Sequence, residues 1–204
     1  MSEARIGRIV VAALHEALAD HLPLRLEFYE TYLRPTGMRA GTIGVASFTA
    51  ALSFLRAEGD AYEPVVRRAG GLAAEWLFAS QPSARRVVWR WLPQGLRARA
   101  AMTLAARLAR LTVVGASGRL AGRRSDRRLL IAGSPFCGTR HRVDAPLCGF
   151  YAAALQRFFD LLEVAATADA VECRAAGADT CVVRVAAAAA VPVAAHAPTG
   201  RLFS

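Results

Sequence analysis

Three cysteines in the C-terminal half of the chain have a spacing that suits metal binding. Cys173 and Cys181 lie on either side of a turn at residues 177–179, and apolar residues occupy every second position on both sides of it. This alternation predicts two strands of one hairpin. Directly opposed residues in such a pair have Cβ atoms about 4.5–5.5 Å apart, so the two thiols suit a shared metal ion, or a disulfide after a small adjustment. Cys148 precedes them at the start of a predicted helix.

A structural zinc ion takes four ligands in a tetrahedral array. Cys137 lies at a bend just before the same helix and is a candidate for the fourth position. In a reducing compartment, cysteines are more plausible as metal ligands or buried apolar residues than as disulfide partners. We therefore predict zinc as a structural cofactor, and the alternative is that the thiols are simply small apolar side chains of the core. The predicted metal ligands are Cys137, Cys148, Cys173 and Cys181.

The N-terminal part of the chain has the apolar spacing of helices, interrupted by proline and glycine breakers. Asp60, with Glu63 three residues later, resembles a capping box and is expected to begin the fourth helix. The predicted helices lie within residues 6–18, 26–33, 48–55, 60–77, 84–91 and 96–111.

Near residue 111 the pattern changes to β-rich runs. Residues 111–114 and 129–131 are predicted to pair as a hairpin, joined by a polar connection at 118–128. Its basic tip at 123–128 is most simply a solvated loop, and an anionic partner is the alternative. Asp144 is predicted to cap a helix that has Pro146 in its first turn and an apolar stripe along its length.

These elements predict an α/β (α+β) fold in which a helical N-terminal layer packs on a small antiparallel sheet. We expect residues 1–110 to form the helical part and residues 111–186 the sheet-containing domain, with both parts in one globular unit. Residues 187–204 are rich in alanine and proline and are predicted to be a weakly ordered tail.

The composition sets limits on function. The formal net charge is +10 and its positive part comes from arginine alone, because the chain has no lysine. The arginines are spread along the chain without an aromatic-interleaved RNA motif, so no nucleic-acid partner is expected. We predict a cytoplasmic protein, because no secretory signal precedes the first amphipathic segment, and no transmembrane segment, because the apolar tracts are too short.

The order of these elements resembles that of the 4-vinyl-reductase-type domain family, whose fold relatives include TRAPP vesicle-tethering subunits and haem-NO-binding domains. The resemblance covers roughly residues 110–186. It is carried by the Ser134-Pro135-Phe136 bend, by Pro146-Leu147-Cys148, and most specifically by the string from Glu172-Cys173-Arg174-Ala175-Ala176-Gly177 to Cys181.

The resemblance implies a protein that binds a small apolar or aromatic molecule and holds a structural zinc through cysteines. Cys148, Cys173 and Cys181 match the family's thiolate ligands. The family's carboxylate ligand would fall at Ala170, which is a departure from the pattern. Asp169, Glu172 or Cys137 could replace it, or the site has lost its metal.

On this basis we expect a non-catalytic binding protein for a small hydrophobic molecule, such as a tetrapyrrole or an aromatic hydrocarbon, that forms a homodimer. The alternatives are an accessory protein of bacteriochlorophyll biosynthesis with 4-vinyl-reductase-like activity, and a TRAPP-like dimeric scaffold. No hydrolase triad, phosphate-binding loop or dinucleotide fingerprint is present. The expected ligand pocket includes Trp76, Phe158, Phe159 and His141, although aromatic residues of this kind could equally fill an ordinary core.

Overall fold

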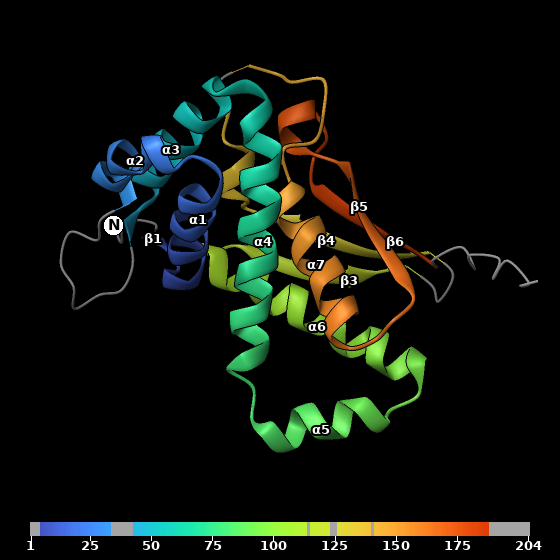
Figure 1. The fold of residues 1–204 in the computed structure, drawn as a ribbon. Helices are drawn as coiled ribbons and strands as arrows, with labels where there is room; N and C mark the ends of the chain where they lie inside the picture. The colour runs from blue at the N-terminus through green and yellow to red at the C-terminus, as the bar shows by residue number, and fades with distance from the viewer. Residues whose placement is uncertain (1–4, 34–42, 114, 123–125, 140, 188–204) are drawn as a thin grey trace, which may run out of the picture.

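The computed structural model describes residues 5–33, 43–113, 115–122, 126–139 and 141–187. Its helices alternate with short strands in the N-terminal part and with a larger sheet in the C-terminal part (Figure 1). The helices are α1 (Arg8–His21), α2 (Leu26–Leu33), α3 (Val45–Ala57), α4 (Tyr62–Ala79), α5 (Ser83–Trp91), α6 (Gln94–Thr112) and α7 (Gly149–Leu161). The six helices predicted before residue 112 are all present, so the 3.6-residue apolar period was a reliable signal here.

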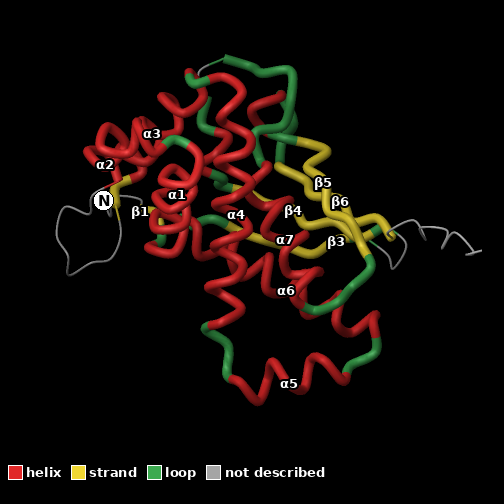
Figure 2. Tube along the Cα trace, viewed as in Figure 1, coloured by secondary structure: helices red, strands yellow, loops and turns green. Residues whose placement is uncertain are grey.

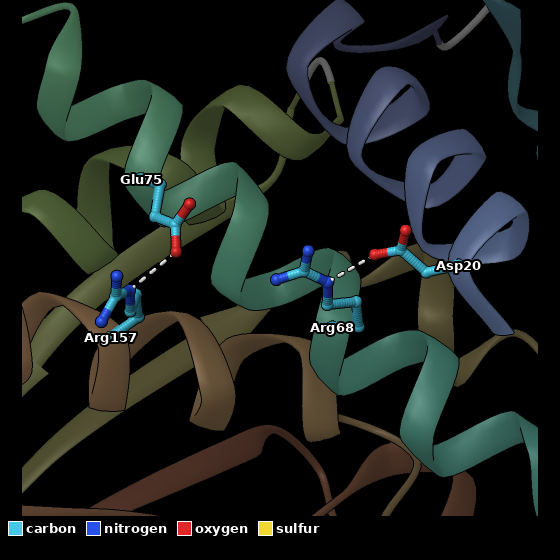
Figure 3. A network of polar contacts seen from close by, with 4 residues as sticks. All are labelled: Asp20, Arg68, Glu75 and Arg157. Carbon is cyan, nitrogen blue, oxygen red and sulfur yellow. Dashed lines mark hydrogen bonds and ion pairs between the residues drawn. The ribbon is translucent and has the colours of Figure 1, made fainter.

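Helix α4 lies at the centre of the helical part, between α1 and α7. Each of these contacts includes an ion pair at its rim: Arg68 of α4 binds Asp20 of α1, and Arg157 of α7 binds Glu75 of α4, both at 2.8 Å (Figure 3). The closest approach to α7 is at Gly70, where an added Cβ atom would lie 2.1 Å from the carbonyl oxygen of Phe150. Only a residue without a side chain allows the two backbones to come this near.

The main sheet is antiparallel, with strand order β3-β4-β6-β5 (Figure 2). Its strands are β3 (Ser117–Ala121), β4 (Arg127–Ala132), β5 (Ala166–Glu172) and β6 (Cys181–Ala187). Helices α6 and α7 cover one face, where Leu129 pairs with Val183 and Ile131 pairs with Cys181. All four of these side chains are fully buried, whereas Arg184 on the opposite face is exposed. This one-sided burial follows from the period-2 alternation of the strands.

A second, two-stranded sheet pairs β1 (Arg5–Ile6) with β2 (Ile43–Gly44). Ile6 also forms an isolated bridge to Val113 at the end of α6. The predicted α+β class is confirmed, with helices packed on small antiparallel sheets.

Three local predictions are wrong. Residues 111–114 do not form a strand, because α6 continues to Thr112 and the first strand of the hairpin is β3. Asp144 does not cap a helix, since α7 begins only at Gly149 and Cys148 occupies its N-cap position. Asp60 lies in the 3-10 turn Gly59–Ala61 that precedes α4 and makes no side-chain cap.

Among the described helices, none combines the length and the apolar character that crossing a bilayer requires. Of the predicted tail, residues 188–204 lie outside the described part of the chain.

Candidate metal centre

The four cysteines of the chain meet at one buried point. Their sulfur atoms all lie within 4.8 Å of one another, and Sγ–Sγ separations of 3.0 to 3.2 Å join Cys137 to each of the other three. Each sulfur comes from a different segment: the 3-10 turn Pro135–Cys137, the start of α7, the residue after β5, and the first residue of β6. All four thiols are free and buried.

Packing fixes the segment that carries Cys137. The ring of its neighbour Phe136 stacks on Phe150 of α7, with ring centroids 4.6 Å apart. From α3, the Arg56 guanidinium donates hydrogen bonds to the carbonyl oxygens of Phe136 and Gly138, at 3.4 and 3.2 Å. The bend after β4 is therefore held on both sides of Cys137.

A tight turn brings Cys173 and Cys181 together. The last pair of the β5–β6 ladder is Glu172 with Val182, and continuing this register by one residue sets Cys173 opposite Cys181, as predicted. The ladder itself stops at Glu172, because residues Arg174–Ala176 turn into a 3-10 helix. Gly177 ends that turn with φ +95°, a conformation that glycine adopts without strain.

Backbone and thiol hydrogen bonds favour the ionised form of the two hairpin cysteines. Bonds from the other thiols, together with the N–H of Leu147, lower the pKa of Cys173. Bonds from Cys137 and Cys148, together with the N–H of Arg174, lower the pKa of Cys181. In contrast, bonds to the neighbouring sulfurs and burial raise the pKa of Cys148. The cluster therefore favours thiolates on the hairpin side, and a bound cation would ionise a coordinating thiol outright.

The donor set fits a tetrahedral zinc ion. With Zn–S bonds of about 2.3 Å, the sulfurs of a tetrahedral site lie about 3.8 Å apart, within the 4.8 Å span of this cluster. The observed separations exceed by far the roughly 2.05 Å of a disulfide bond. Cys137 completes the set, so no carboxylate is needed where the chain has Ala170, and both Asp169 and Glu172 are exposed.

The residues predicted to line an aromatic pocket do not lie together at one surface. Phe158 and Phe159 are fully buried in the core, Trp76 is 37% exposed on α4, and His141 is exposed in the loop before α7. His141 is also not among the residues grouped around the four sulfurs.

A cavity that the sequence pattern did not reveal lies between α5 and α6. Its volume is about 370 Å³. Apolar atoms come from Trp89, Leu92 and Leu96, and arginines including Arg99 and Arg107 add positive charge to the lining. The lining residues belong mainly to two helices that each have the pattern of ordinary amphipathic segments, so only their packing discloses the space between them.

Comparison with known proteins identifies the C-terminal part. The family model of the 4-vinyl-reductase-type domain matches residues 128–187, a segment that contains all four cysteines. No curated protein and no solved structure is significantly similar to the chain.

Proposed function

The chain contains a 4-vinyl-reductase-type domain, and we propose that it is a non-catalytic binding protein for a small hydrophobic molecule, organised by a structural zinc ion. The observation that carries the proposal is the buried four-cysteine cluster inside that domain. Four protein thiolates fill the coordination sphere of zinc and leave no position for water or substrate. That arrangement is typical of structural sites, whereas catalytic zinc keeps an open position.

The zinc ion, when bound, supplies a cross-link. The residues of the chain do the positioning: Cys137 anchors the bend after β4, Cys148 the start of α7, and the other two cysteines the β5–β6 connection. Because α7 also packs against α4, the cluster ties the edge of the sheet to the helical part of the protein.

The cavity between α5 and α6 supports binding of a molecule with an apolar body and an acidic group. Its volume of about 370 Å³ lies within the range of small-molecule sites. Trp89 and Leu96 offer apolar surface, and Arg99 and Arg107 offer positive charge. A tetrapyrrole or aromatic carboxylic acid combines these two properties. A pocket around Trp76, Phe158, Phe159 and His141 is a weaker candidate, since Phe158 and Phe159 would have to leave the core.

Native mass spectrometry before and after denaturation, with elemental analysis, tests both parts of this proposal. We expect about one zinc ion per chain and a non-covalent small molecule that is released on denaturation. Replacing Ala100, which lines the cavity, by tryptophan should lower the occupancy of that molecule and leave the zinc content unchanged. A metal-free protein would contradict the structural site, and unchanged ligand occupancy in Ala100→Trp would contradict the location.

The same measurements separate the alternatives. A ligand-free dimer would favour a TRAPP-like scaffold over a binding protein. Turnover of a divinyl tetrapyrrole with NADPH and no other protein would establish a 4-vinyl-reductase-like activity and overturn the non-catalytic assignment.

A further inference from the structure

Helix α5 turns an apolar stripe toward solvent. Ala84, Val87, Val88 and Trp91 follow the i, i+3, i+4, i+7 spacing of one helix face. In the described structure Trp91 is 85% exposed, Val88 is 56% exposed and Val87 is 55% exposed. In an amphipathic helix of a globular protein this face would lie against the core, so its outward orientation calls for a partner.

The opposite face of α5 attaches the helix to the rest of the protein. Trp89 packs on Phe78 of α4, with ring centroids 5.7 Å apart. Within the described chain, no residue of α5 is fully buried, and the cavity of about 370 Å³ separates it from part of α6. The helix is therefore oriented by Trp89 while its apolar stripe stays free of the core.

The charge around the stripe is of one sign. Arg85 and Arg90 are exposed beside it, and Arg86 is half-buried on the same helix. Between Glu75 and Asp126 the sequence has ten arginines and no acidic residue. An exposed apolar stripe flanked by arginine is the composition of helices that lie in the interface of a membrane, where the guanidinium groups reach the lipid headgroups.

The placement of α5 suits a planar partner. Pro82 and Pro93 bound the helix, which crosses the lower end of the molecule in Figure 1, and the connections to α4 and α6 both leave it on the side of the protein body. The outer face is thus presented along its whole length. A flat surface can contact all of the stripe at once without meeting α4 or α6.

We propose that α5 is an interfacial helix that docks the protein on an anionic lipid surface, with Val87, Val88 and Trp91 entering the headgroup region and Arg85 and Arg90 binding lipid phosphates. An exposed apolar stripe has no role in contacts with a nucleic-acid backbone, which favours lipid over a polyanion. This inference goes beyond the proposed function, because the cysteine cluster takes no part in it.

Vesicle sedimentation tests the proposal with the full-length protein. Binding to phosphatidylcholine vesicles that contain phosphatidylglycerol should exceed binding to phosphatidylcholine alone and should fall as salt is added. The tryptophan fluorescence should shift to the blue on binding, and the shift should be lost in Trp91→Phe, because Trp91 is the tryptophan that inserts. Equal binding to both kinds of vesicle, or no binding to either, would overturn the proposal.

Two sets of variants separate the stripe from general stickiness and charge. The triple variant Val87→Ser, Val88→Ser, Trp91→Ser should lower the partition coefficient at least about tenfold. Its control is Leu24→Ser, which removes a 98% exposed apolar residue elsewhere and should leave binding unchanged. Circular dichroism would verify that both variants fold.

The double variant Arg85→Gln, Arg90→Gln should weaken binding by roughly thirtyfold, since each arginine near an anionic surface contributes roughly a factor of five. The control Arg119→Gln, Arg184→Gln removes the same charge from the exposed positions of the sheet. Equal losses in both pairs would overturn the assignment to α5. Self-association that disappears in the triple variant, or tighter binding to duplex DNA than to the anionic vesicles, would also overturn it.

Discussion

The Sγ atom of Cys137 lies 3.0 Å from the Sγ atom of Cys148, although a bend and the exposed loop before α7 separate the two residues in sequence. The cluster thus closes this loop at its base. Cys137 belongs to a bend held by Phe136 and Arg56, so its position is defined by packing as well as by any metal.

The variant Cys137→Ser should lose the metal, because a hydroxyl is a poor zinc ligand compared with a thiolate. We expect a loss of about 4 kcal/mol in the free energy of unfolding, as befits removal of a structural metal. For a chain of this size that corresponds to a fall of roughly 8–16 °C in melting temperature. Differential scanning calorimetry and elemental analysis measure the two effects together.

The matched controls for that variant are Asp169→Asn and Glu172→Gln. Both residues are exposed near the hairpin that carries Cys173, but neither belongs to the cluster. Their metal content should equal that of the unmodified protein. Metal loss in either control would show that a carboxylate, rather than Cys137, supplies the fourth ligand.

Thiol reactivity should report the metal directly. All four cysteines are buried, so an aromatic disulfide reagent should modify none of them quickly in the native protein. Treatment with a strong zinc chelator should release the metal, lower the melting temperature and make the four thiols reactive. Rapid modification before chelation would contradict the existence of a closed, metal-filled site. Zinc added back to the chelated protein should restore protection.

Two adjacent glycines of α4 give an internal comparison. An added Cβ at Gly70 would lie 2.1 Å from the Phe150 carbonyl oxygen, whereas nothing lies within 4 Å of one at Gly71. Gly70→Ala should therefore cost about 3 kcal/mol, because α4 and α7 must move apart. Gly71→Ala should stabilise the protein by about 0.5–1 kcal/mol through higher helix propensity. Urea denaturation of the two variants measures the contrast, and equal effects would refute the close helix crossing.

Stability should fall as the pH rises above 10. Burial, and to a lesser extent the negative charge of Glu58, raise the pKa of Tyr29 to about 12. Burial also raises the pKa of Tyr62 and of Tyr151. Above about pH 10 the folded protein retains these protons while the unfolded chain releases them, so ionisation favours unfolding. The contribution of Tyr29 is present below about pH 10 and is lost progressively toward about pH 12.

The variant Tyr29→Phe isolates this effect. Its melting temperature should decline less steeply than that of the unmodified protein between about pH 10 and pH 12, with a difference of at most about 2 kcal/mol in the free energy of unfolding. Melting curves recorded at several pH values test this. Parallel declines in the two proteins would show that Tyr29 ionises normally in the folded state.

The helical part was accessible from sequence because its apolar period is regular and its breakers are strong. The errors occurred where local chemistry was ambiguous. Thr112 and Val113 have β-branched side chains, yet α6 continues to Thr112, which is buried and bonds to Leu108 within the helix. Asp144 and Pro146 form a credible helix start, but the chain stays irregular until Cys148 reaches the cluster. In both places tertiary contacts outweighed local propensity.

The metal ligands were accessible from residue type, whereas their geometry was only partly so. The turn at Gly177 correctly indicated that Cys173 and Cys181 face each other. The approach of Cys137 depends on Phe136, Phe150 and Arg56, which come from three separate segments. The cavity beside α5 had no sequence signal, because apolar residues that line a space are of the same types as those that fill one.

The strand order has a consequence for how the protein is made. Strand β4 pairs with β6, about fifty residues further along the chain, while β5 is made first and ends at the edge of the sheet. During synthesis the β3–β4 hairpin must therefore wait, with one edge unpaired, until nearly the last described residue has left the ribosome. Such non-local pairing is slow and exposes a strand edge to wrong partners. The last two cysteines emerge in the same interval, so metal capture and closure of the sheet become a single late step.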